Sequence, residues 1–303
     1  MISKEYDPVA ELCTLRDWIR YGTSCFRSAG LVFGHGTQNA TDEAAFLLLS
    51  SLDLPIDQLD PWLDCKLTHE ERKKIASLFE KRISTRKPAS YLINKAYIGD
   101  KKFFVDERVI VPRSYIGELL RDGLQTIISN PDAISSVLDL CTGSGCLAIL
   151  AALNFTNSHV AAVDISPEAL QVADINISEY GLKDRIMLLQ SDLFSGLKQD
   201  RFDLILSNPP YVMQKAIEAF PPEYQAEPRI AHFGGKDGLD IVRRILREAP
   251  RYLSSDGILV VEVGTGRDLL ENEYPNYPFF WLDTEISSGE VFVLRAEEIS
   301  EKE

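Results

Sequence analysis

The sequence predicts an α/β fold with a mostly parallel sheet, preceded by a small helical domain. From Val137 onward, short apolar runs typical of buried strands alternate with helical segments. The first ninety residues instead carry apolar residues at helical spacing. A glycine-rich loop, 141–145, joins the first of the buried strands to a helix. Together these observations predict a ligand site at the carboxyl ends of the strands.

Composition is that of a globular protein. The chain has 303 residues, of which 45% are hydrophobic and 26% charged, and no apolar run is long enough to span a bilayer. The N-terminal residues lack the apolar segment of a signal peptide, and the five cysteines are scattered. We therefore expect a cytoplasmic protein with reduced thiols.

Charge is distributed unevenly along the chain, whose net charge is −14. Residues 1–105 carry 15 Lys/Arg and 14 Asp/Glu, whereas residues 106–303 carry 17 and 32. A domain this acidic is poorly suited to follow a phosphate backbone, and it suits a basic partner. We expect neither direct nucleic-acid specificity nor a membrane partner, although surface acid also serves solubility alone.

The helical domain is expected over residues 1–90. Apolar spacing predicts helices over 7–29 and 41–52, the second capped by Thr41. Thr68 begins a third helix through a capping box, and Pro88 stops it. The linker 91–108 contains a predicted β-hairpin that turns at Gly99-Asp100.

The sheet domain is expected over residues 109–303. The run Val109-Ile110-Val111-Pro112-Arg113 predicts a short strand, and a helix to about Ile128 follows it. The remaining expected elements are, in order, strand 137–140, helix 146–153, strand 160–163, helix 166–180, strand 186–189, strand 202–206, helix 238–253, strand 258–263, and an antiparallel pair, 279–282 with 291–294.

The loop Cys141-Thr142-Gly143-Ser144-Gly145 has the context of a dinucleotide-binding turn, because it follows a strand and opens a helix. Asp164 ends the next strand, where a carboxylate accepts hydrogen bonds from ribose hydroxyls. These features fit NAD and S-adenosylmethionine equally well. A glycine-rich turn with no ligand is the simpler interpretation of the loop alone.

Two further aspartates follow the same pattern. Asp139 precedes the loop by two residues and favours a ligand with an ammonium or sulfonium group, since a carboxylate there repels a pyrophosphate. Asp192, followed by Leu193, comes after the third strand of this series, where it can accept from an adenine amino group. The placement of aspartates at successive strand ends favours S-adenosylmethionine.

The run Asn208-Pro209-Pro210-Tyr211 directly follows a strand. Each proline removes a backbone donor, and a residue before proline is held extended, so the strand ends with free carbonyl groups. We expect Asn208 and Pro209 to accept the two N–H groups of a planar amide or amino group. Tyr211 packs on that group in this interpretation, and the prolines, Pro210 included, aim the carbonyl and leave few competing donors. A rigid turn that merely ends the strand is the alternative.

Taken in order, these motifs resemble the class I S-adenosylmethionine-dependent methyltransferases, and within them the HemK-type protein glutamine methyltransferases. The resemblance extends to 111–113, 222–228 and 234–239. It implies a Rossmann-like seven-stranded sheet, an N-terminal domain that recognises the substrate, and a connecting β-hairpin. It also implies S-adenosylmethionine as cofactor, S-adenosylhomocysteine as product, and no metal.

The resemblance assigns roles residue by residue. It implies catalysis by Asn208, Pro209 and Tyr211 and substrate binding by Asn208, Pro209, Pro210 and Tyr211. It implies cofactor binding by Asp139, Cys141, Thr142, Gly143, Ser144, Gly145, Asp164, Asp192, Leu193 and Asn208. Cys141 stands where the family usually has glycine.

Residues 33–37 and 113–118 resemble the branch that methylates a glutamine of large-subunit ribosomal protein three, a basic protein. Other functions stay open: the same reaction on peptide chain release factors, adenine methylation of nucleic acid, an NAD(P)-dependent dehydrogenase, or a non-catalytic ribosome assembly factor. The lack of a basic patch disfavours nucleic acid. A dehydrogenase leaves the run at 208–211 unexplained.

Overall fold

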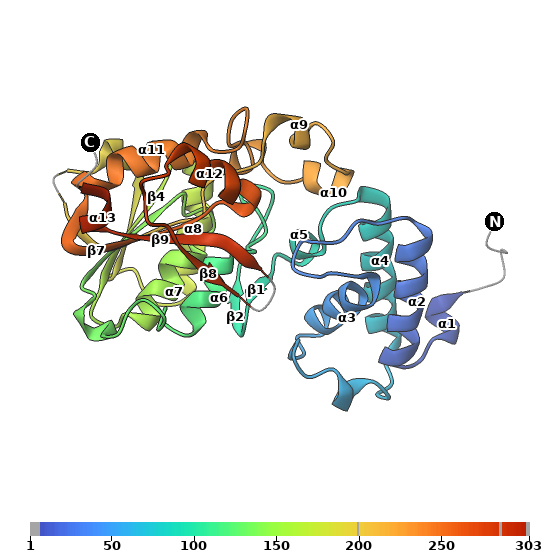
Figure 1. Ribbon diagram of the computed structural model, residues 1–303. Coiled ribbons are helices and arrows are strands. Elements are labelled where there is room, and N and C mark those ends of the chain that lie inside the picture. The colour runs from blue at the N-terminus through green and yellow to red at the C-terminus, as the bar shows by residue number, and fades with distance from the viewer. Residues whose placement is uncertain (1–6, 199, 285–286, 301–303) are drawn as a thin grey trace. The chain divides into compact units, whose positions relative to one another are not determined.

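The computed structural model describes residues 7–198, 200–284 and 287–300, and these form two compact units (Figure 1). The helical unit comprises the described residues up to Ala96, Val105–Glu107 and Phe220–Glu227. The sheet unit comprises Tyr97–Phe104, Arg108–Ala219 and the described residues from Pro228 onward. The boundaries expected at residues 90 and 108 differ from these, because most of the hairpin belongs to the sheet unit and a late segment belongs to the helical one.

The helical unit packs its helices around a core that includes Trp18, Phe26, Leu48 and Phe79. Its helices are α1 Pro8–Glu11, α2 Leu15–Ser28, α3 Ala40–Ser51, the 3₁₀ turn η1 Asp60–Trp62, α4 His69–Thr85, α5 Ala89–Ile93 and α10 Pro222–Gln225. No helix in the described part of the chain is long and apolar enough to cross a membrane.

Two expectations for this unit need correction. The single helix expected over 7–29 is two helices, because Thr14 makes an isolated bridge with Lys66 and then caps α2 through a reciprocal pair of hydrogen bonds with Asp17. The cap of α3 is Asn39, whose side chain accepts from two backbone amides, and not Thr41. The capping box at Thr68 is confirmed.

Buried charges tie the segment 220–227 into the helical unit. Arg82, which is fully buried on α4, lies 2.7 Å from Glu43 Oε1 and 3.7 Å from Glu223 Oε1. Glu223 Oε1 also lies 2.9 Å from Arg86 Nη2 and accepts from the Val32 amide at 3.1 Å. Since an uncompensated buried charge is costly, these groups depend on one another.

A second contact between the same segments involves the glycine-flanked histidine. His35 is 1% exposed, its Nε2 lies 3.5 Å from Glu227 Oε2, and its ring lies 4.3 Å from the ring of Tyr224. A Cβ at Gly34 would clash with the Tyr224 hydroxyl, which explains the glycine at that position. Residues 33–37 therefore contact the segment 220–227 within the helical unit.

The sheet unit is built on seven strands in the order β5-β4-β3-β6-β7-β9-β8. The strands are β3 Ser136–Leu140, β4 His159–Asp164, β5 Ile186–Gln190, β6 Phe202–Ser207, β7 Leu253–Glu262, β8 Phe280–Asp283 and β9 Ser288–Arg295. The first five in this order are parallel, whereas β9 pairs antiparallel with both β7 and β8. The α/β class with an added antiparallel pair is thus confirmed, as is the separate hairpin of β1 Ala96–Ile98 and β2 Lys101–Phe103.

Helices cover both faces of this sheet, with α6 and α7 on one face and α11 and α12 on the other (Figure 1). Alternate residues of β3 follow this division, because Val137 packs in one core and Leu138 in the other. The helices of the sheet unit are α6 Tyr115–Arg121, α7 Cys146–Asn154, α8 Pro167–Glu179, α9 Gln214–Ile217, α11 Asp240–Glu248, α12 Arg267–Glu273 and α13 Ala296–Ser300. Its 3₁₀ turns are η2 Pro131–Ala133, η3 Leu193–Gly196, η4 Arg229–Ala231, η5 Ala249–Arg251 and η6 Gly264–Gly266.

Three sequence expectations for this unit are wrong. Residues 109–113 form no strand, because Pro112 within the run lacks a backbone donor. The helix expected to reach Ile128 ends at Arg121, since Gly123 and Leu124 take left-handed backbone angles, with φ of +64° and +54°. The helix expected over 238–253 is α11 followed by η5, because Pro250 cannot continue an α-helix, and β7 begins already at Leu253.

Candidate active site

A cavity of about 300 Å³ lies at the carboxyl ends of β3, β4, β5 and β6 within the sheet unit. It is lined by six of the predicted cofactor residues: Cys141, Gly143, Asp164, Asp192, Leu193 and Asn208. Pro210 also lines it. The predicted residues Asp139, Thr142, Ser144, Gly145, Pro209 and Tyr211 are not among the lining residues.

The glycine loop is shaped by left-handed backbone angles. Gly143 has φ +55° and Gly145 has φ +79°, and a Cβ at Gly145 would lie 3.1 Å from the Cβ of Ala173 on α8. Glycine at 145 thus permits close packing of the loop on the neighbouring helix. Cys141 has φ +60°, which is a strained angle for a residue with a side chain.

Asp139 lies beneath the loop. Its side chain is fully buried, and its Oδ2 accepts from Thr142 Oγ1 at 2.5 Å and from the Ala148 amide at 3.0 Å. Its Oδ1 is buried and has no hydrogen-bond partner among the residues that the structure describes. Burial raises the pKa of Asp139 to about 7. The Asp139 carboxylate therefore fixes the loop through Oδ2, and its Oδ1 remains as an unpaired acceptor.

The pKa of Asp139 leads to a pH-dependent stability. Because its pKa is raised, Asp139 binds a proton more readily in the folded protein than in the unfolded chain between about pH 4 and pH 7. The free energy of unfolding therefore falls as pH rises through that window. The fall is up to about 1.4 kcal/mol per pH unit. Asp139→Asn should remove the contribution of Asp139 to this dependence, so that the variant gains stability relative to wild type from pH 4 to 7. Urea unfolding at several pH values measures it.

Asp203→Asn is the matched control for that experiment. Asp203 lies at the amino end of β6. Burial acts to raise its pKa, but the hydrogen bonds that it accepts from Ser135, Ser136 and Ser254 have the larger combined effect. The pKa of Asp203 is therefore lowered. Its replacement should therefore cost stability above about pH 4, the opposite sign. Identical pH profiles for wild type and Asp139→Asn would contradict the prediction.

Asp164 connects two turns at the floor of the cavity. Its Oδ2 accepts from the Gly143 amide and its Oδ1 from the Ser166 amide, both at 2.9 Å. Burial raises its pKa, and these amide donors act in the opposite direction. Each oxygen keeps lone pairs for a ligand hydroxyl, so the predicted ribose contact is chemically feasible.

Sequence reasoning missed the cation that pairs with Asp192. Arg244, on α11, lies with its Nη1 2.9 Å from Asp192 Oδ1, and both residues line the cavity. The rest of the lining is largely apolar and includes Ile165, Ile230 and Phe233, whose side chains are exposed. No local motif marks Arg244, because it meets Asp192 only through the packing of α11 on the sheet.

The run after β6 is positioned by its first residue. Ser207 Oγ donates to the Leu140 carbonyl at 3.0 Å, which joins the end of β6 to the end of β3. Asn208 then lines the cavity and Pro209 is buried. Within the described residues, neither the Asn208 carboxamide nor the Pro209 carbonyl has a hydrogen-bond partner. Asn208 therefore offers an unpaired acceptor at the cavity, and the next residue, Pro209, carries a second unpaired acceptor.

The position of Tyr211 is fixed by Glu262, a residue that no sequence motif indicated. Its hydroxyl donates to Glu262 Oε1, at the end of β7, over 3.0 Å. The role predicted for its ring, packing on a planar amide, stays a prediction. Glu262 lies 51 residues further along the chain, so only the sheet order brings the two together.

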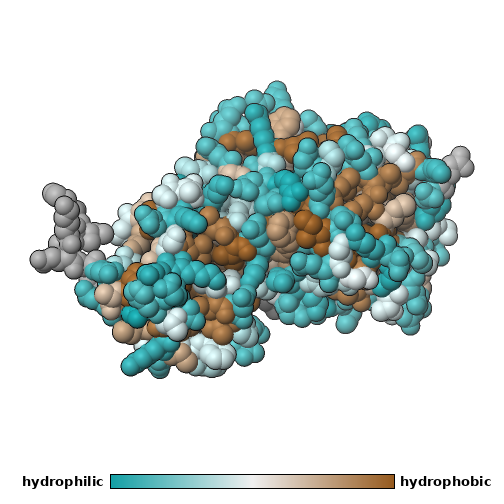
Figure 2. Space-filling model, turned by 180° about the vertical axis from the view of Figure 1, so that it is seen from behind, coloured by the Kyte–Doolittle hydropathy of each residue, from teal (hydrophilic) through white to brown (hydrophobic). Residues whose placement is uncertain are grey.

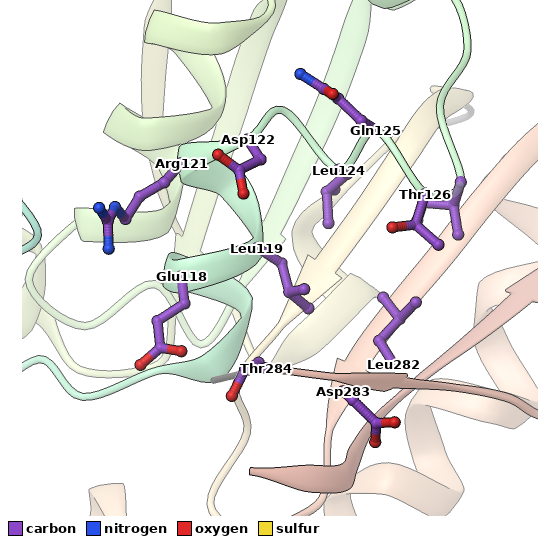
Figure 3. A pocket seen from close by; sticks show the side chains of 11 residues that line it. Glu118, Leu119, Arg121, Asp122, Leu124, Gln125, Thr126, Leu282, Asp283 and Thr284 are labelled. Carbon is purple, nitrogen blue, oxygen red and sulfur yellow. The ribbon is translucent and has the colours of Figure 1, made fainter. Parts of the chain in front are cut away.

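A larger hollow of about 620 Å³ in the sheet unit does not share this chemistry. Figure 3 shows the side chains of Leu119, Leu124 and Leu282 toward its centre, with charged residues such as Arg121 and Asp283 around them. It lies beside the edge strand β8 and contains none of the predicted site residues. In the described part of the chain, no group of three His, Cys, Asp or Glu could hold a metal ion.

Comparison with known proteins assigns a class to this fold and site. Residues 118–220, which carry the glycine loop and the run after β6, match the family described as "Methyltransferase small domain". Together with the relatives described next, this match shows that the protein is a methyltransferase. A methyltransferase from Pyrococcus furiosus has a similar solved structure, with a TM-score of 0.44, 18% identity, and coverage of 62% of this chain and 89% of that one. That likeness is too distant to refine the class.

Curated relatives define the family more narrowly. The chain is 52% identical to a protein of Bradyrhizobium diazoefficiens, over 95% of this chain and 92% of the relative. It is 49% identical to a protein of Neisseria meningitidis, over 95% of each. Both relatives are named ribosomal protein uL3 glutamine methyltransferase. The chain belongs to this family.

Proposed function

We propose that this protein transfers a methyl group from S-adenosylmethionine to the side-chain amide nitrogen of a glutamine in ribosomal protein uL3. The observation that carries the proposal is a pair of acceptors without partners among the described residues: the Asn208 carboxamide, which lines the cavity, and the carbonyl of the next residue, Pro209. A primary amide presents two N–H donors in one plane, and this pair can accept both. The names of the relatives supply the protein substrate.

The residues at the cavity fit S-adenosylmethionine. Asp164 offers acceptors for ribose hydroxyls, and Asp192 can accept from the adenine amino group while Arg244 holds it in place. The unpartnered Oδ1 of Asp139 and the carboxylate of Asp164 favour a cationic ligand near the loop. When bound, the cofactor supplies a methyl group on a sulfonium, which is strongly electrophilic.

The protein's own part in the reaction is to orient the amide. An amide nitrogen is a weak nucleophile because its lone pair is delocalised, so alignment with the methyl group matters most. Asn208 and Pro209 accept the two N–H groups and stabilise the positive charge that develops on the nitrogen. The N–C bond would form as the S–C bond to the methyl group breaks, which would leave S-adenosylhomocysteine, and the nitrogen would then lose one proton to solvent. Tyr211 supports the flat amide.

The charge of the chain suits the partner. Most of its excess acid lies after residue 105, and a basic protein is attracted to such a surface. Figure 2 shows that hydrophilic residues cover most of the visible face. We further propose that the helical unit contributes to recognition of uL3, and that the reaction takes place in the cytoplasm.

Methyl transfer to purified proteins tests the proposal. The enzyme is incubated with methyl-labelled S-adenosylmethionine and uL3, and peptide mass spectrometry locates the methyl group. We expect one methylated glutamine in uL3, and no label when that glutamine is changed to alanine. Peptide chain release factors and duplex DNA are the parallel substrates. Label on either of these, with none on uL3, would replace uL3 as the substrate.

A further inference from the structure

Glu262 forms a buried connection that the reaction described above does not use. It is the last residue of β7 and is 0% exposed. Its Oε2 accepts from Ser114 Oγ at 2.7 Å and from the Tyr115 amide at 2.9 Å. Its Oε1 accepts from the Tyr211 hydroxyl at 3.0 Å. One carboxylate thus holds two segments that are about a hundred residues apart in sequence.

Both segments contribute walls to the cavity. The segment before α6, which ends at Ser114, supplies the lining residues Arg108, Val109 and Ile110. The segment after β6, which ends at Tyr211, supplies Asn208 and Pro210. The hydrogen bonds of Glu262 therefore fix the ends of two opposing stretches of the lining.

The ring of Tyr211 has little freedom in this arrangement. A Cβ at Gly264 would lie 2.7 Å from Tyr211 Cε2, so the ring packs directly on the backbone that follows β7. The next residue is fixed as well, because Val212 donates to the His232 carbonyl and accepts from the Gly234 amide. With Ser207 bonded to Leu140, the four residues 208–211 are anchored at both ends.

Burial of the Glu262 carboxylate is energetically costly, and its hydrogen bonds therefore matter for the structure around it. Burial raises the pKa of Glu262 to about 7, while the Ser114 and Tyr211 hydroxyls and the backbone amides act in the opposite direction. The hydrogen bonds of a buried carboxylate offset the cost of its burial, and they also fix the groups that donate them. What it holds is the backbone that carries Asn208 and Pro209.

We propose that Glu262 is a positioning residue for methyl transfer: by accepting from Tyr211 and from the Ser114 segment, it keeps the acceptors of Asn208 and Pro209 aimed at the substrate amide. This inference rests on the proposed function. Glu262 touches neither the amide nor the methyl group in this scheme. It acts on the rate of the reaction through the geometry of residues 208–211.

The test compares Glu262→Gln and Tyr211→Phe with Asp203→Asn. Asp203 is a matched control, because it too is a strand carboxylate that accepts from serine hydroxyls and backbone amides, but at the amino end of the sheet. We expect Glu262→Gln to lower kcat with uL3 on the order of ten- to a hundredfold, since small misplacements of reacting groups are that costly. The Kd for S-adenosylhomocysteine, measured by calorimetry, should change less than about threefold, and Asp203→Asn should keep a kcat near wild type.

A second measurement does not depend on the substrate. Hydrogen exchange of residues 207–213 should be faster in Glu262→Gln and in Tyr211→Phe than in wild type, and unchanged in Asp203→Asn. The double variant should be no slower in turnover than the worse single variant, because both changes disrupt the same hydrogen bond between Tyr211 and Glu262. If Glu262→Gln does not fold, Tyr211→Phe alone tests the same bond.

Two results would overturn the inference: unchanged kcat and exchange in folded Glu262→Gln or Tyr211→Phe, or an equal loss of kcat in Asp203→Asn. Failure of the proposed function is distinguishable from either. In that case wild-type enzyme transfers no methyl group to uL3, while the exchange of residues 207–213 still reports whether Glu262 holds the segment.

Discussion

Replacing Asn208 by alanine is expected to lower kcat about a hundredfold, because one preorganised acceptor for the substrate amide is lost. The carboxamide lines the cavity and has no partner among the described residues, so its removal should disturb little else. Affinity for S-adenosylmethionine should stay within a few-fold of wild type. Single-turnover rates with saturating uL3, together with calorimetry for the cofactor, separate the two effects.

Asn208→Asp sharpens this experiment. The aspartate retains an acceptor oxygen at the same place, so it should recover part of the rate that alanine loses. Asn272→Ala is the control, since Asn272 is exposed on α12 and bonds only the Asp268 carbonyl of its own helix. Full turnover in Asn208→Ala with intact cofactor binding would remove Asn208 from the mechanism.

Replacing Arg82 by methionine is expected to destabilise the helical unit by about 3–5 kcal/mol. The substitution keeps most of the side-chain volume but leaves Glu43 without its cation and weakens the compensation of Glu223. Both carboxylates are buried, and burial already raises the pKa of Glu43. Urea unfolding should show an earlier transition, and hydrogen exchange of α3 and α4 should be faster.

Arg16→Met is the matched control. Arg16 also belongs to the helical unit and lies 3.0 Å from Asp64, but both side chains are exposed, and such pairs contribute little. Its replacement should leave the transition nearly unchanged. Equal effects of Arg16→Met and Arg82→Met would show that the buried charges are not the source of stability.

Local signals in the sequence are sufficient to predict the sheet and part of its site. The buried strand 202–206, the glycines at 143 and 145 and the aspartates at strand ends all express their preferences within a few residues, and the structure places several of them at one cavity. Capping boxes are equally local, which is why Thr68 was predictable. The errors arise where a nearby proline or a left-handed residue overrides apolar spacing, as at Pro250 and Leu124.

Other parts of the site could not be predicted because they depend on packing between distant residues. Glu262 reads in the sequence as one acidic residue after an apolar run, and only the neighbouring positions of β6 and β7 place it behind Tyr211. Arg244 is one of several arginines on α11, and nothing local distinguishes it as the partner of Asp192. Contacts between residues that are far apart in the sequence produce no repeating pattern of residue types from which they could be predicted.

The late segment of the helical unit has a consequence for how the chain folds during synthesis. Residues 220–227 supply Glu223 and Glu227, whose partners precede residue 90, and the bond from the Val32 amide to Glu223 spans 191 positions. While the ribosome is still adding the strands of the sheet, Arg82 and Arg86 lack the Glu223 carboxylate. We therefore expect the amino-terminal helices to reach their final state only after residue 227 has emerged.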